Sequence, residues 1–591
     1  MHCDGATTKR IHRWGFLWGS LLLVCFGLLA GRLYYIHQVM RPSLIAYRDA
    51  QQTRTIAIPA RRGLILDRQG RILAGSEDRP SVYVDPGLLE DEELRTVCDA
   101  LAPVLQTNTS ELHQKIEKRS ESRFVWLARR MTSEQGQAIE ALRLPGVGLV
   151  NEPFRYYPNG SLAAHVLGFV NSDGQGLEGV ELQYNNNLSG KAGRYATTCD
   201  VHRRPLWNTE EDVVEPLDGN HLVLTLDIVI QGFLEEAMEK AVEKYSAESA
   251  VGVVMNPQTG AVLAMGCFPT FDLNRYQDFP ANVRRNRCLT DPVEPGSCFK
   301  PFIMSGALAE KVANLDEPIF CGNGTASFPH RVLRDAHPYG TLTVEEILVK
   351  SSNIGMAHLG MRLGNQRLHK YLDAYGFGHK TGIDLPGEDR GIVLPLKKWS
   401  QLSTTSVPMG QEIAITPIQL ATGLSALSNN GEYRRPFVVQ KILDPVGEET
   451  SPNGATNVIR QTVAKDVARS VAQRAMVRMV NDSPHDVKLA QYQVLGKTGT
   501  AQIPRYGHHG YEPDAYVSTF MGAAPAENPQ VAVIIMVRRP KKSIGYYGGM
   551  VSGPAVKEVL FKTLTYLDVP PDKIQESQRM AQVSSPGIPS D

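Results

Sequence analysis

The longest apolar run of the chain lies close to its N-terminus. Residues 14–31, WGFLWGSLLLVCFGLLAG, contain no charged side chain, and LYYIHQV continues the run after Arg32. A helix crosses a membrane with about 20 apolar residues, and a long arginine side chain can reach the water interface from within it. The pattern therefore predicts one membrane-spanning helix at 14–37, and no later segment has a comparable apolar run.

The residues beside this run predict its orientation. Lys9, Arg10 and Arg13 precede it, and basic residues favour the cytoplasmic side, so the chain after residue 37 is expected outside the cytoplasm. Small residues near the end of the run leave a cleaved signal peptide as the alternative. The run is longer than the core of a signal peptide, and Trp and Tyr residues occur at its two ends, which favours an uncleaved anchor.

The first part of the exported chain has a mixed pattern. Residues 55–74 alternate apolar and polar positions between turn sequences, which predicts short strands. Residues 87–143 have apolar positions at helical spacing, and 145–215 are rich in Gly, Asn and turns. We therefore expect an irregular α+β region without a catalytic cluster.

The pattern changes near residue 220. A strand is predicted at 221–227 and a long amphipathic helix at 228–245, followed by two strands joined by an NPQTG turn. Residues 297–430 are mainly helical in pattern, and strands are predicted at 515–525 and 530–540. This order lacks the regular alternation of a parallel sheet and indicates an α+β fold.

These patterns divide the chain into five expected segments. They are a cytoplasmic tail at 1–13, the anchor at 14–37, a pedestal domain at 38–215, a second domain at 216–572 and a polar, disordered tail at 573–591.

Composition excludes several classes of function. Lys plus Arg and Asp plus Glu both number 62, so the net charge is zero, which argues against a nucleic-acid-binding protein. Eight cysteines in 591 residues are too few for a disulfide scaffold, and because none forms a CxxC pair or accompanies a His cluster, we predict no metal site and no cofactor. Cys288, Cys298 and Cys321 could form a bridge, but we expect buried free thiols.

The first candidate for chemistry is the stretch EPGSCFKPF. Ser297 and Lys300 are three positions apart, so they share one face of the helix that is predicted to begin there. A lysine whose pKa is lowered by burial or by a nearby cation can take the proton of a serine hydroxyl. Pro301 disfavours α geometry at Lys300, so we expect an irregular first turn. By itself, this spacing is common on protein surfaces.

Two further patterns lie downstream of this pair. In VKSSNIGM, Ser351 and Asn353 could line one side of a pocket, although Ser and Asn also occur at ordinary helix caps. In LGKTGTAQ, a strand pattern contains Lys497, Thr498 and Gly499. Lys-Thr-Gly also occurs at 380–382, between a helix and a Gly- and Pro-rich loop, and we assign that copy to structure.

The three patterns occur in the order found in serine β-lactamases and penicillin-binding proteins. The chain resembles a class B penicillin-binding protein over nearly its whole length. RRGLILDRQGRILA, RYYPNGSLAAHVLGFV and GLEGVELQYNNNLSG resemble the pedestal of that family, and EPGSCFKP, KSSNIGMAHLG, TGIDLPGE, ITPIQLATGLSALSNNGEY and GKTGTAQ resemble its transpeptidase core. RDAHPYGTLTVEEILVKSSN and YYGGMVSGPAVKEVL are more similar to division-type than to elongation-type members. Cys298 departs from the family, which commonly has Thr or another small residue there.

The resemblance implies a fold and an activity. The fold would be α+β, with a single transmembrane helix, a dimerisation-type pedestal and a β-lactamase-like transpeptidase domain that has an antiparallel sheet and a helical subdomain. The activity would be a D,D-transpeptidase of septal wall synthesis that acts on peptidoglycan stem peptides ending in D-Ala-D-Ala and is acylated by β-lactams. The catalytic domain would lie on the periplasmic side of the inner, or plasma, membrane.

The resemblance also implies a role for each site residue. Ser297 would be the nucleophile and Lys300 its general base, Ser351 would relay the proton, and Asn353 would hold Lys300 and the substrate amide. Backbone N–H groups of Ser297 and Thr500 would hold the oxyanion. The substrate-binding set would be Lys497, Thr498, Gly499 and Thr500, with the lysine and the two threonines on the terminal carboxylate.

The remaining alternatives concern the reaction and the partners. A β-lactamase, a β-lactam sensor, a D,D-carboxypeptidase, an elongation-type transpeptidase and a non-catalytic division scaffold each share part of this pattern. Because class B members lack a glycosyltransferase domain, the resemblance implies a SEDS-type membrane glycosyltransferase and divisome proteins as partners.

Overall fold

The computed structural model describes residues 5–120, 122, 124–198, 211–452, 458–505, 507 and 510–573. The chain forms two compact units. Unit 1 consists of residues 1–60 and 191–217, and unit 2 of residues 61–190 and 218–591. The disordered tail that the sequence predicts at 573–591 lies outside the described residues after Lys573, as do the first four residues of the predicted cytoplasmic tail.

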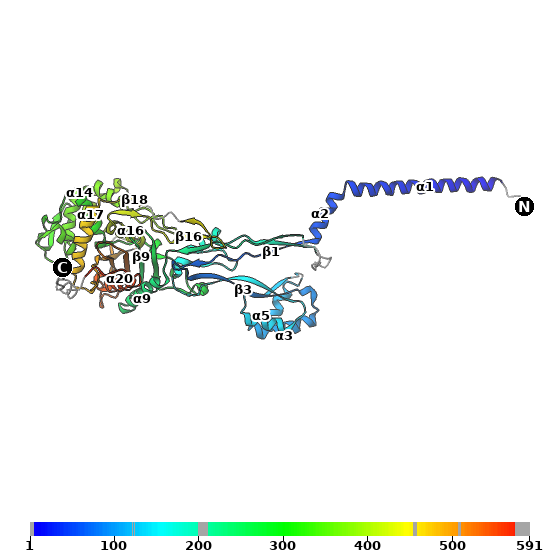
Figure 1. The fold of residues 1–591 in the computed structure, drawn as a ribbon, viewed down its shortest axis with the longest axis horizontal. Helices are drawn as coiled ribbons and strands as arrows, with labels where there is room; N and C mark the ends of the chain where they lie inside the picture. The colour runs from blue at the N-terminus through cyan, green and yellow to red at the C-terminus, as the bar shows by residue number, and fades with distance from the viewer. Residues whose placement is uncertain are drawn as a thin grey trace, which may run out of the picture. The chain divides into compact units, whose positions relative to one another are not determined.

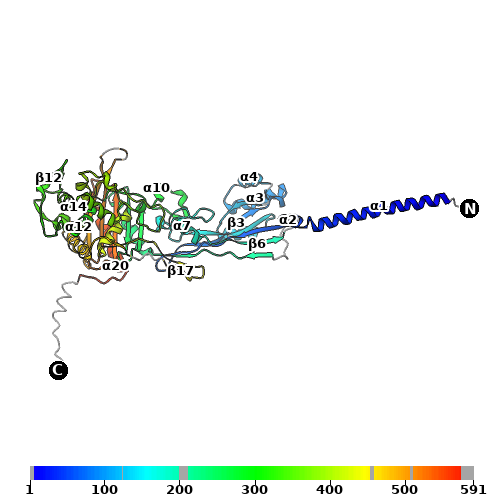
Figure 2. The same ribbon diagram turned by 90° about the horizontal axis from the view of Figure 1, so that it is seen from above.

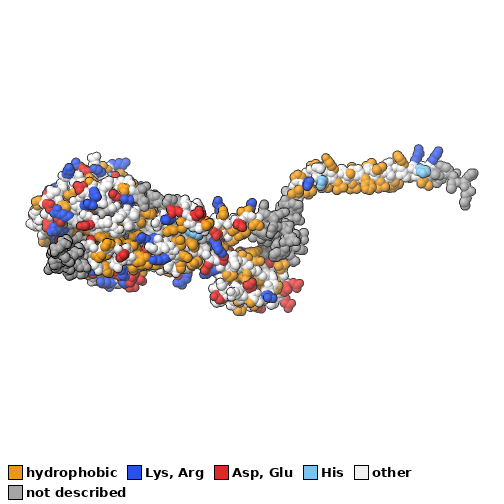
Figure 3. Space-filling model, viewed as in Figure 1, with side chains coloured by type: hydrophobic (Ala, Val, Ile, Leu, Met, Phe, Trp, Pro, Cys, Tyr) orange, Lys and Arg blue, Asp and Glu red, His pale blue; other side chains and the backbone are white. Residues whose placement is uncertain are grey.

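Unit 1 contains the apolar helix. Helix α1 (Gly5–Gln38) is followed by α2 (Arg41–Gln52) and by an antiparallel sheet of strand order β1 (Thr53–Ile58), β6 (Gly193–Thr198) and β7 (Glu211–Val214). Within the described residues, α1 is the one helix long and apolar enough to cross a membrane, over Lys9–Gln38. Its apolar side chains are exposed along its length (Figure 3). The predicted segment 14–37 lies within this helix.

A five-stranded antiparallel sheet forms the centre of unit 2. Its strand order is β10 (Val262–Phe268), β9 (Ser249–Met255), β21 (Val531–Arg538), β20 (Tyr511–Ala524) and β19 (Leu495–Pro504). The predicted strands at 515–525 and 530–540 form β20 and β21. Strand β19, which carries the Lys-Thr-Gly sequence, lies at one edge of this sheet.

Both faces of this sheet are covered. Helices α9 (Ile228–Lys244) and α20 (Gly553–Tyr566) cover one face, and α12 (Lys300–Ala309) and α16 (Pro417–Ser428) belong to the core on the other (Figures 1 and 2). Side chains alternate between the two faces of β21. Val533 and Ile535 therefore join the core under α9 and α20, whereas Ile534 joins the core under α12 and α16. A strand that is apolar at nearly every position is typical of a doubly covered sheet.

A second sheet of unit 2 combines strands from the segment after residue 61 with strands from later parts of the chain. The strand order is β17 (Glu449–Pro452), β16 (Val439–Leu443), β8 (His221–Leu224), β2 (Ile65–Leu66), β3 (Ile72–Val84) and β4 (Val125–Ala128), and β5 (Val147–Tyr156) also pairs with β3. Helices α3 (Asp91–Leu105), α4 (Thr109–Glu117) and α5 (Ser133–Leu142) pack on its far end around a third core. These helices agree with the helical pattern predicted at 87–143.

A buried ion cluster joins three segments of this region. Glu181 in α7 (Gly179–Gln183) is fully buried and accepts hydrogen bonds from Arg62 at 2.6 Å and from Arg155 of β5 at 2.7 Å. Tyr157 also donates to Glu181, at 3.2 Å. Buried charges are stable only when they are paired and hydrogen-bonded, so this cluster fixes the three segments relative to one another.

Two parts of the fold differ from the sequence pattern. Strand β5 is regular over 10 residues, although its region reads as irregular, because most of its side chains are half exposed and show no clear alternation. The helical pattern at 297–430 is interrupted by β11 (Pro318–Phe320), β12 (Thr325–Phe328), β13 (Arg331–Arg334) and β14 (Thr341–Thr343), which form two short antiparallel pairs. These strands are too short to give a periodic signal.

Candidate active site

The segment that carries Ser297 enters helix α12 through a tight turn. Gly296–Phe299 form a 3₁₀ turn, η3, and Gly296 has a φ of 54°, in the left-handed region that favours glycine. The irregular first turn predicted from Pro301 is therefore present, but Lys300 itself is α-helical, with φ −54° and ψ −41°. A Cβ atom at Gly296 would lie 3.4 Å from the carbonyl oxygen of Thr500, so this turn lies against strand β19.

Lys300 is fully buried at the start of α12. Its Nζ donates hydrogen bonds to the Ser351 carbonyl at 2.6 Å, to Asn353 Oδ1 at 2.8 Å and to Ser351 Oγ at 3.2 Å. Burial, and then the nearby Lys497 cation, hold the pKa of Lys300 well below its usual value, and Asp335 acts in the opposite direction. Among the residues that the structure describes, no hydrogen bond joins Ser297 Oγ to Lys300.

Ser351 lies in a strained turn between two helices. Helix α13 (Val344–Val349) ends just before it and α14 (Asn353–Ala374) begins just after it, and Ser351 itself has a φ of 58°. Non-glycine residues in this region cost energy and are concentrated at functional sites. The turn places Ser351 Oγ 3.2 Å from Lys300 Nζ and 3.1 Å from Lys497 Nζ, so one hydroxyl bridges both lysines.

Asp335 holds the beginning of α14, and the sequence analysis did not identify it. Its carboxylate accepts hydrogen bonds from the Asn353 N–H at 2.5 Å, the Ile354 N–H at 3.1 Å and Ser352 Oγ at 2.6 Å. Ser352 in turn caps the helix by accepting from the Gly355 N–H at 2.9 Å. A carboxylate at a helix N-terminus is favoured by the helix dipole, so Asp335 fixes the position of Asn353.

Strand β19 contributes the second buried lysine. Lys497 is fully buried, and desolvation lowers its pKa to about 8. Its Nζ also donates to the Thr498 carbonyl at 3.1 Å. Thr498 and Thr500 of the same strand are less buried than Lys497, and Thr498 Oγ1 lies 3.5 Å from Lys497 Nζ. Thr500 Oγ1 accepts a hydrogen bond of 3.0 Å from the Gly548 N–H.

Comparisons with known proteins agree with this arrangement. Residues 250–561 match the penicillin-binding protein transpeptidase domain, and residues 57–224 match the penicillin-binding protein dimerisation domain. The chain belongs to the class B penicillin-binding proteins. It is 33% identical to the probable peptidoglycan D,D-transpeptidase PbpC of Pseudomonas aeruginosa over 94% of this chain and 95% of the relative.

Two further relatives support the division-type assignment and the fold. This penicillin-binding protein is 30% identical to the peptidoglycan D,D-transpeptidase FtsI of Escherichia coli K12, over 97% of this chain and 95% of FtsI. The solved structure of penicillin binding protein 3 from Mycobacterium tuberculosis with aztreonam has a TM-score of 0.68 and 25% identity, and the match covers 88% of this chain and 98% of that one.

The apolar helix α1 is consistent with a membrane anchor that leaves the catalytic domain outside the cell interior.

The site of this penicillin-binding protein brings three distant segments together. Lys300, Ser351 and Asn353 share hydrogen bonds, and Lys497 joins them through Ser351. Ser297, Thr498 and Thr500 lie on the same two elements, η3–α12 and β19, which pack against each other. The second Lys-Thr-Gly copy lies outside this network: Thr381 donates to Glu388 from both its N–H and its hydroxyl, at 2.6 Å each.

Close packing explains several small residues of the candidate site. A Cβ atom at Gly499 would lie 2.7 Å from Cys298 Sγ, so this glycine allows β19 to contact η3 as well as a substrate. A Cβ atom at Gly548 would lie 2.2 Å from the Gly499 carbonyl oxygen. Gly549 is close as well, since its Cβ atom would lie 3.1 Å from Thr498 Cγ2, so both glycines of the YYGGMVSG stretch pack against the candidate site.

The three cysteines that the sequence singled out are buried. Cys288, Cys298 and Cys321 are buried free thiols, as predicted. Burial raises the pKa of Cys298 to about 12, and its Sγ lies 3.6 Å from the Lys497 carbonyl, away from Lys300. Within the described residues, no group of three or more His, Cys, Asp and Glu side chains could hold a metal ion.

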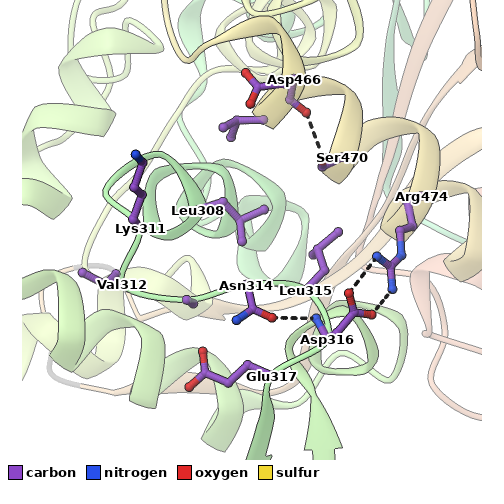
Figure 4. Close-up of a pocket in the computed structure, with 12 residues that line it drawn as sticks. Leu308, Lys311, Val312, Asn314, Leu315, Asp316, Glu317, Asp466, Ser470 and Arg474 are labelled. Atoms are coloured by element: carbon purple, nitrogen blue, oxygen red, sulfur yellow. Dashed lines mark hydrogen bonds and ion pairs between the residues drawn. The ribbon is translucent and has the colours of Figure 1, made fainter.

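An ion network supports the helix that precedes Ser351. Arg474, in a π-helical segment at Ser470–Met476, donates to Glu345 of α13 at 2.9 Å and also pairs with Asp316 (Figure 4). Asp316 and Arg474 lie at one side of a cavity of about 490 Å³, which also reaches the C-terminal end of α12. The network therefore fixes α13 relative to the segment that leads into β19.

Proposed function

We propose that this protein is a division-type peptidoglycan D,D-transpeptidase that cross-links stem peptides through an acyl-enzyme on Ser297. The observation that carries this proposal is the contact of two buried lysines, Lys300 and Lys497, with the single hydroxyl of Ser351 beside η3. A lysine with a lowered pKa can act as a base at neutral pH, and a second cation can bind a carboxylate. Both groups are needed for a donor that ends in D-Ala-D-Ala.

The acylation step uses Lys300 as the general base. Its neutral amine takes the proton from Ser297 Oγ while this oxygen attacks the carbonyl carbon of the penultimate D-Ala. The C–N bond to the terminal D-Ala then breaks, and Ser351 relays a proton from Lys300 to the leaving amine, since its hydroxyl contacts Lys300 at 3.2 Å. Asn353 holds the Lys300 amine through the 2.8 Å hydrogen bond and fixes its direction.

Strand β19 binds the donor. Lys497 holds the terminal carboxylate together with Thr498 and Thr500. The backbone N–H groups of Ser297 and Thr500 hold the oxyanion, and each of these two donors contributes about 100-fold or more to the rate. Because β19 is the edge strand of its sheet, the backbone of the peptide can lie alongside it. An amine from a neighbouring stem then attacks the ester carbon, forms the cross-link and releases Ser297. β-Lactams mimic the donor and acylate the same oxygen.

The location and the partners follow from the anchor and the family. The chain is expected in the inner, or plasma, membrane, with the catalytic domain on the periplasmic side, because the basic residues precede α1. A SEDS-type glycosyltransferase and divisome proteins would supply the glycan strand and contact the anchor and the pedestal at 38–215. The activity would then serve septal wall synthesis, and an elongation role is the second candidate.

Labelling with a fluorescent penicillin tests this proposal. A stable adduct that peptide mapping places on Ser297 and that persists through a washout of many minutes is the expected result. Ser297→Ala should abolish the adduct while the fold remains, and Lys300→Ala should bind penicillin without forming an adduct. An adduct that turns over in seconds would favour a β-lactamase, and labelling that persists in Ser297→Ala would exclude Ser297 as nucleophile.

A further inference from the structure

A second cavity of unit 2 lies outside the catalytic network. Its volume is about 430 Å³, which lies in the range of small-molecule sites. Its walls come from the GLEGVELQ segment, from the RRNRCLT segment and from the LPG turn at 385–387. None of the residues that line it belongs to the three motifs of the active site.

One wall of this cavity carries Arg284, whose side chain forms no hydrogen bond and no ion pair within the described residues. Arg284 lies over the ring of Phe169, with its guanidinium carbon 5.2 Å from the ring centre, and 5.7 Å from that of Tyr276. These two rings stack on each other at 3.9 Å. Within the described part of the chain, the buried Nε of Arg284 has no hydrogen-bond partner. The aromatic shelf thus holds the guanidinium in place, and within the described residues its two terminal nitrogens make no hydrogen bond either.

The opposite charge occurs in the same cavity, within electrostatic reach of Arg284 but without a hydrogen bond to it among the described residues. Glu178 is half buried, and among the described residues its carboxylate makes no hydrogen bond and no ion pair. Burial raises the pKa of this carboxyl, and Arg284 and His165 counteract the effect. Leu182, Leu289 and Pro386 supply apolar wall between the charged groups. The neighbouring Arg285 differs, since it pairs with Asp291 at 2.9 Å.

We infer that this cavity binds a zwitterionic peptide, with its carboxylate on Arg284 and its ammonium group on Glu178. Charged groups that are partly removed from water and lack hydrogen bonds are costly, and a ligand with both charges would give each of them a charge-assisted hydrogen bond. The volume is larger than a single alanine requires and fits a short peptide.

The inference rests on the proposed function for the identity of the peptide. A transpeptidase meets two kinds of molecule that carry both charges. One is the un-cross-linked stem peptide, and the other is the free D-alanine that the reaction releases. We assign the cavity to a stem peptide. It would be a second peptide subsite, formed between the pedestal segment that contains Glu178 and the transpeptidase domain.

The test uses the full-length chain in detergent with Ser297 already acylated by penicillin, so that the catalytic site is closed. Calorimetry measures the binding of a synthetic alanine pentapeptide that has a free amine and a D-Ala-D-Ala end. Arg284→Gln and Glu178→Gln should each weaken binding about tenfold or more, the effect of losing one charge-assisted hydrogen bond. Arg275→Gln, which changes an exposed arginine outside the cavity, should leave binding unchanged.

Modified peptides sharpen the test. N-acetylation should weaken binding to the wild type but not further in Glu178→Gln, and C-terminal amidation should do the same for Arg284→Gln. Free D-alanine that binds alone, with the same dependence on both variants, would support the zwitterion site and replace the stem peptide as its ligand. Absence of binding by both probes, or binding that is equal in all variants, would overturn the inference.

Failure of the proposed function gives a different result. Penicillin labelling of each variant reports separately on folding and on Ser297, and we expect it to be normal in all of them. A chain that forms no adduct contradicts the transpeptidase proposal, whereas a chain that is acylated but binds no peptide contradicts only the second subsite.

Discussion

At the scale of single residues, the site depends on two lysines with different ionisation. Lys300 has to be neutral to act as a base, whereas Lys497 has to be charged to hold a carboxylate. The pKa of Lys300 is held well below its usual value, and that of Lys497 lies at about 8. Because both amines contact Ser351 Oγ, the positive charge of Lys497 disfavours a charge on Lys300 and contributes to its lowered pKa.

These pKa values predict a bell-shaped pH dependence for acylation by penicillin. The rate should rise as pH rises through the lowered pKa of Lys300, because the neutral amine becomes more abundant. It should fall above about pH 8, where Lys497 loses its charge. Rapid-mixing measurements of the acylation rate against pH test this prediction.

Lys497→Arg is the matched control for the falling limb. Arginine keeps its charge at all accessible pH values, so the falling limb should move to much higher pH while the rising limb remains. A falling limb that stays near pH 8 in this variant would remove Lys497 as its cause.

At the scale of elements, Asp335 links β13 to the start of α14. Asp335→Asn keeps the size of the side chain but removes the charge that accepts from two backbone N–H groups and from Ser352. We expect acylation by penicillin to slow about tenfold or more, because Asn353 loses its fixed position. Asp373→Asn, an exposed change near the other end of α14, should leave the rate unchanged. Equal rates in both variants would assign Asp335 to helix capping alone.

The ion cluster around Glu181 joins separate elements of the pedestal, as Asp335 joins β13 to α14. Glu181→Ala leaves Arg62 and Arg155 buried without their carboxylate, and breaking such a buried pair costs about 3–5 kcal/mol of unfolding free energy. Glu77→Ala, at the exposed pair with Arg79, should cost about 1 kcal/mol or less. Denaturant unfolding of both variants measures the difference, and similar losses would contradict the role of burial.

The sequence indicates the candidate site residues more directly than the residues that hold them in position. Ser297, Lys300 and Lys497 could be found because their spacing and order are local properties of the chain. The role of Asp335 could not, since it depends on how the end of β13 packs against α14. The left-handed turn at Ser351 also has no local signal, because a serine between two helices reads as helical. Strands β20 and β21 were predictable from their long apolar runs, whereas the half-exposed β5 was not.

At the scale of the whole molecule, anchoring and catalysis belong to different compact units. Helix α1 lies in unit 1, and all residues of the candidate site lie in unit 2. Deletion of residues 1–38 should therefore move the protein from the membrane fraction to the soluble fraction while labelling of Ser297 by penicillin remains. Fractionation and fluorescent labelling of the truncated chain check this prediction, and loss of labelling in a folded, truncated chain would contradict it.

The convergence of residues 300, 351 and 497 on one hydroxyl also has a consequence for biogenesis. Contacts between segments so far apart in sequence form late in folding, because the loops between them must close first. In the proposed mechanism, a chain released early, or one whose last strands have not yet joined the sheet, has Ser297 but lacks the groups that activate it. Covalent capture of penicillin therefore counts only molecules that have completed folding, and a pulse of the drug during synthesis would time the last step of maturation.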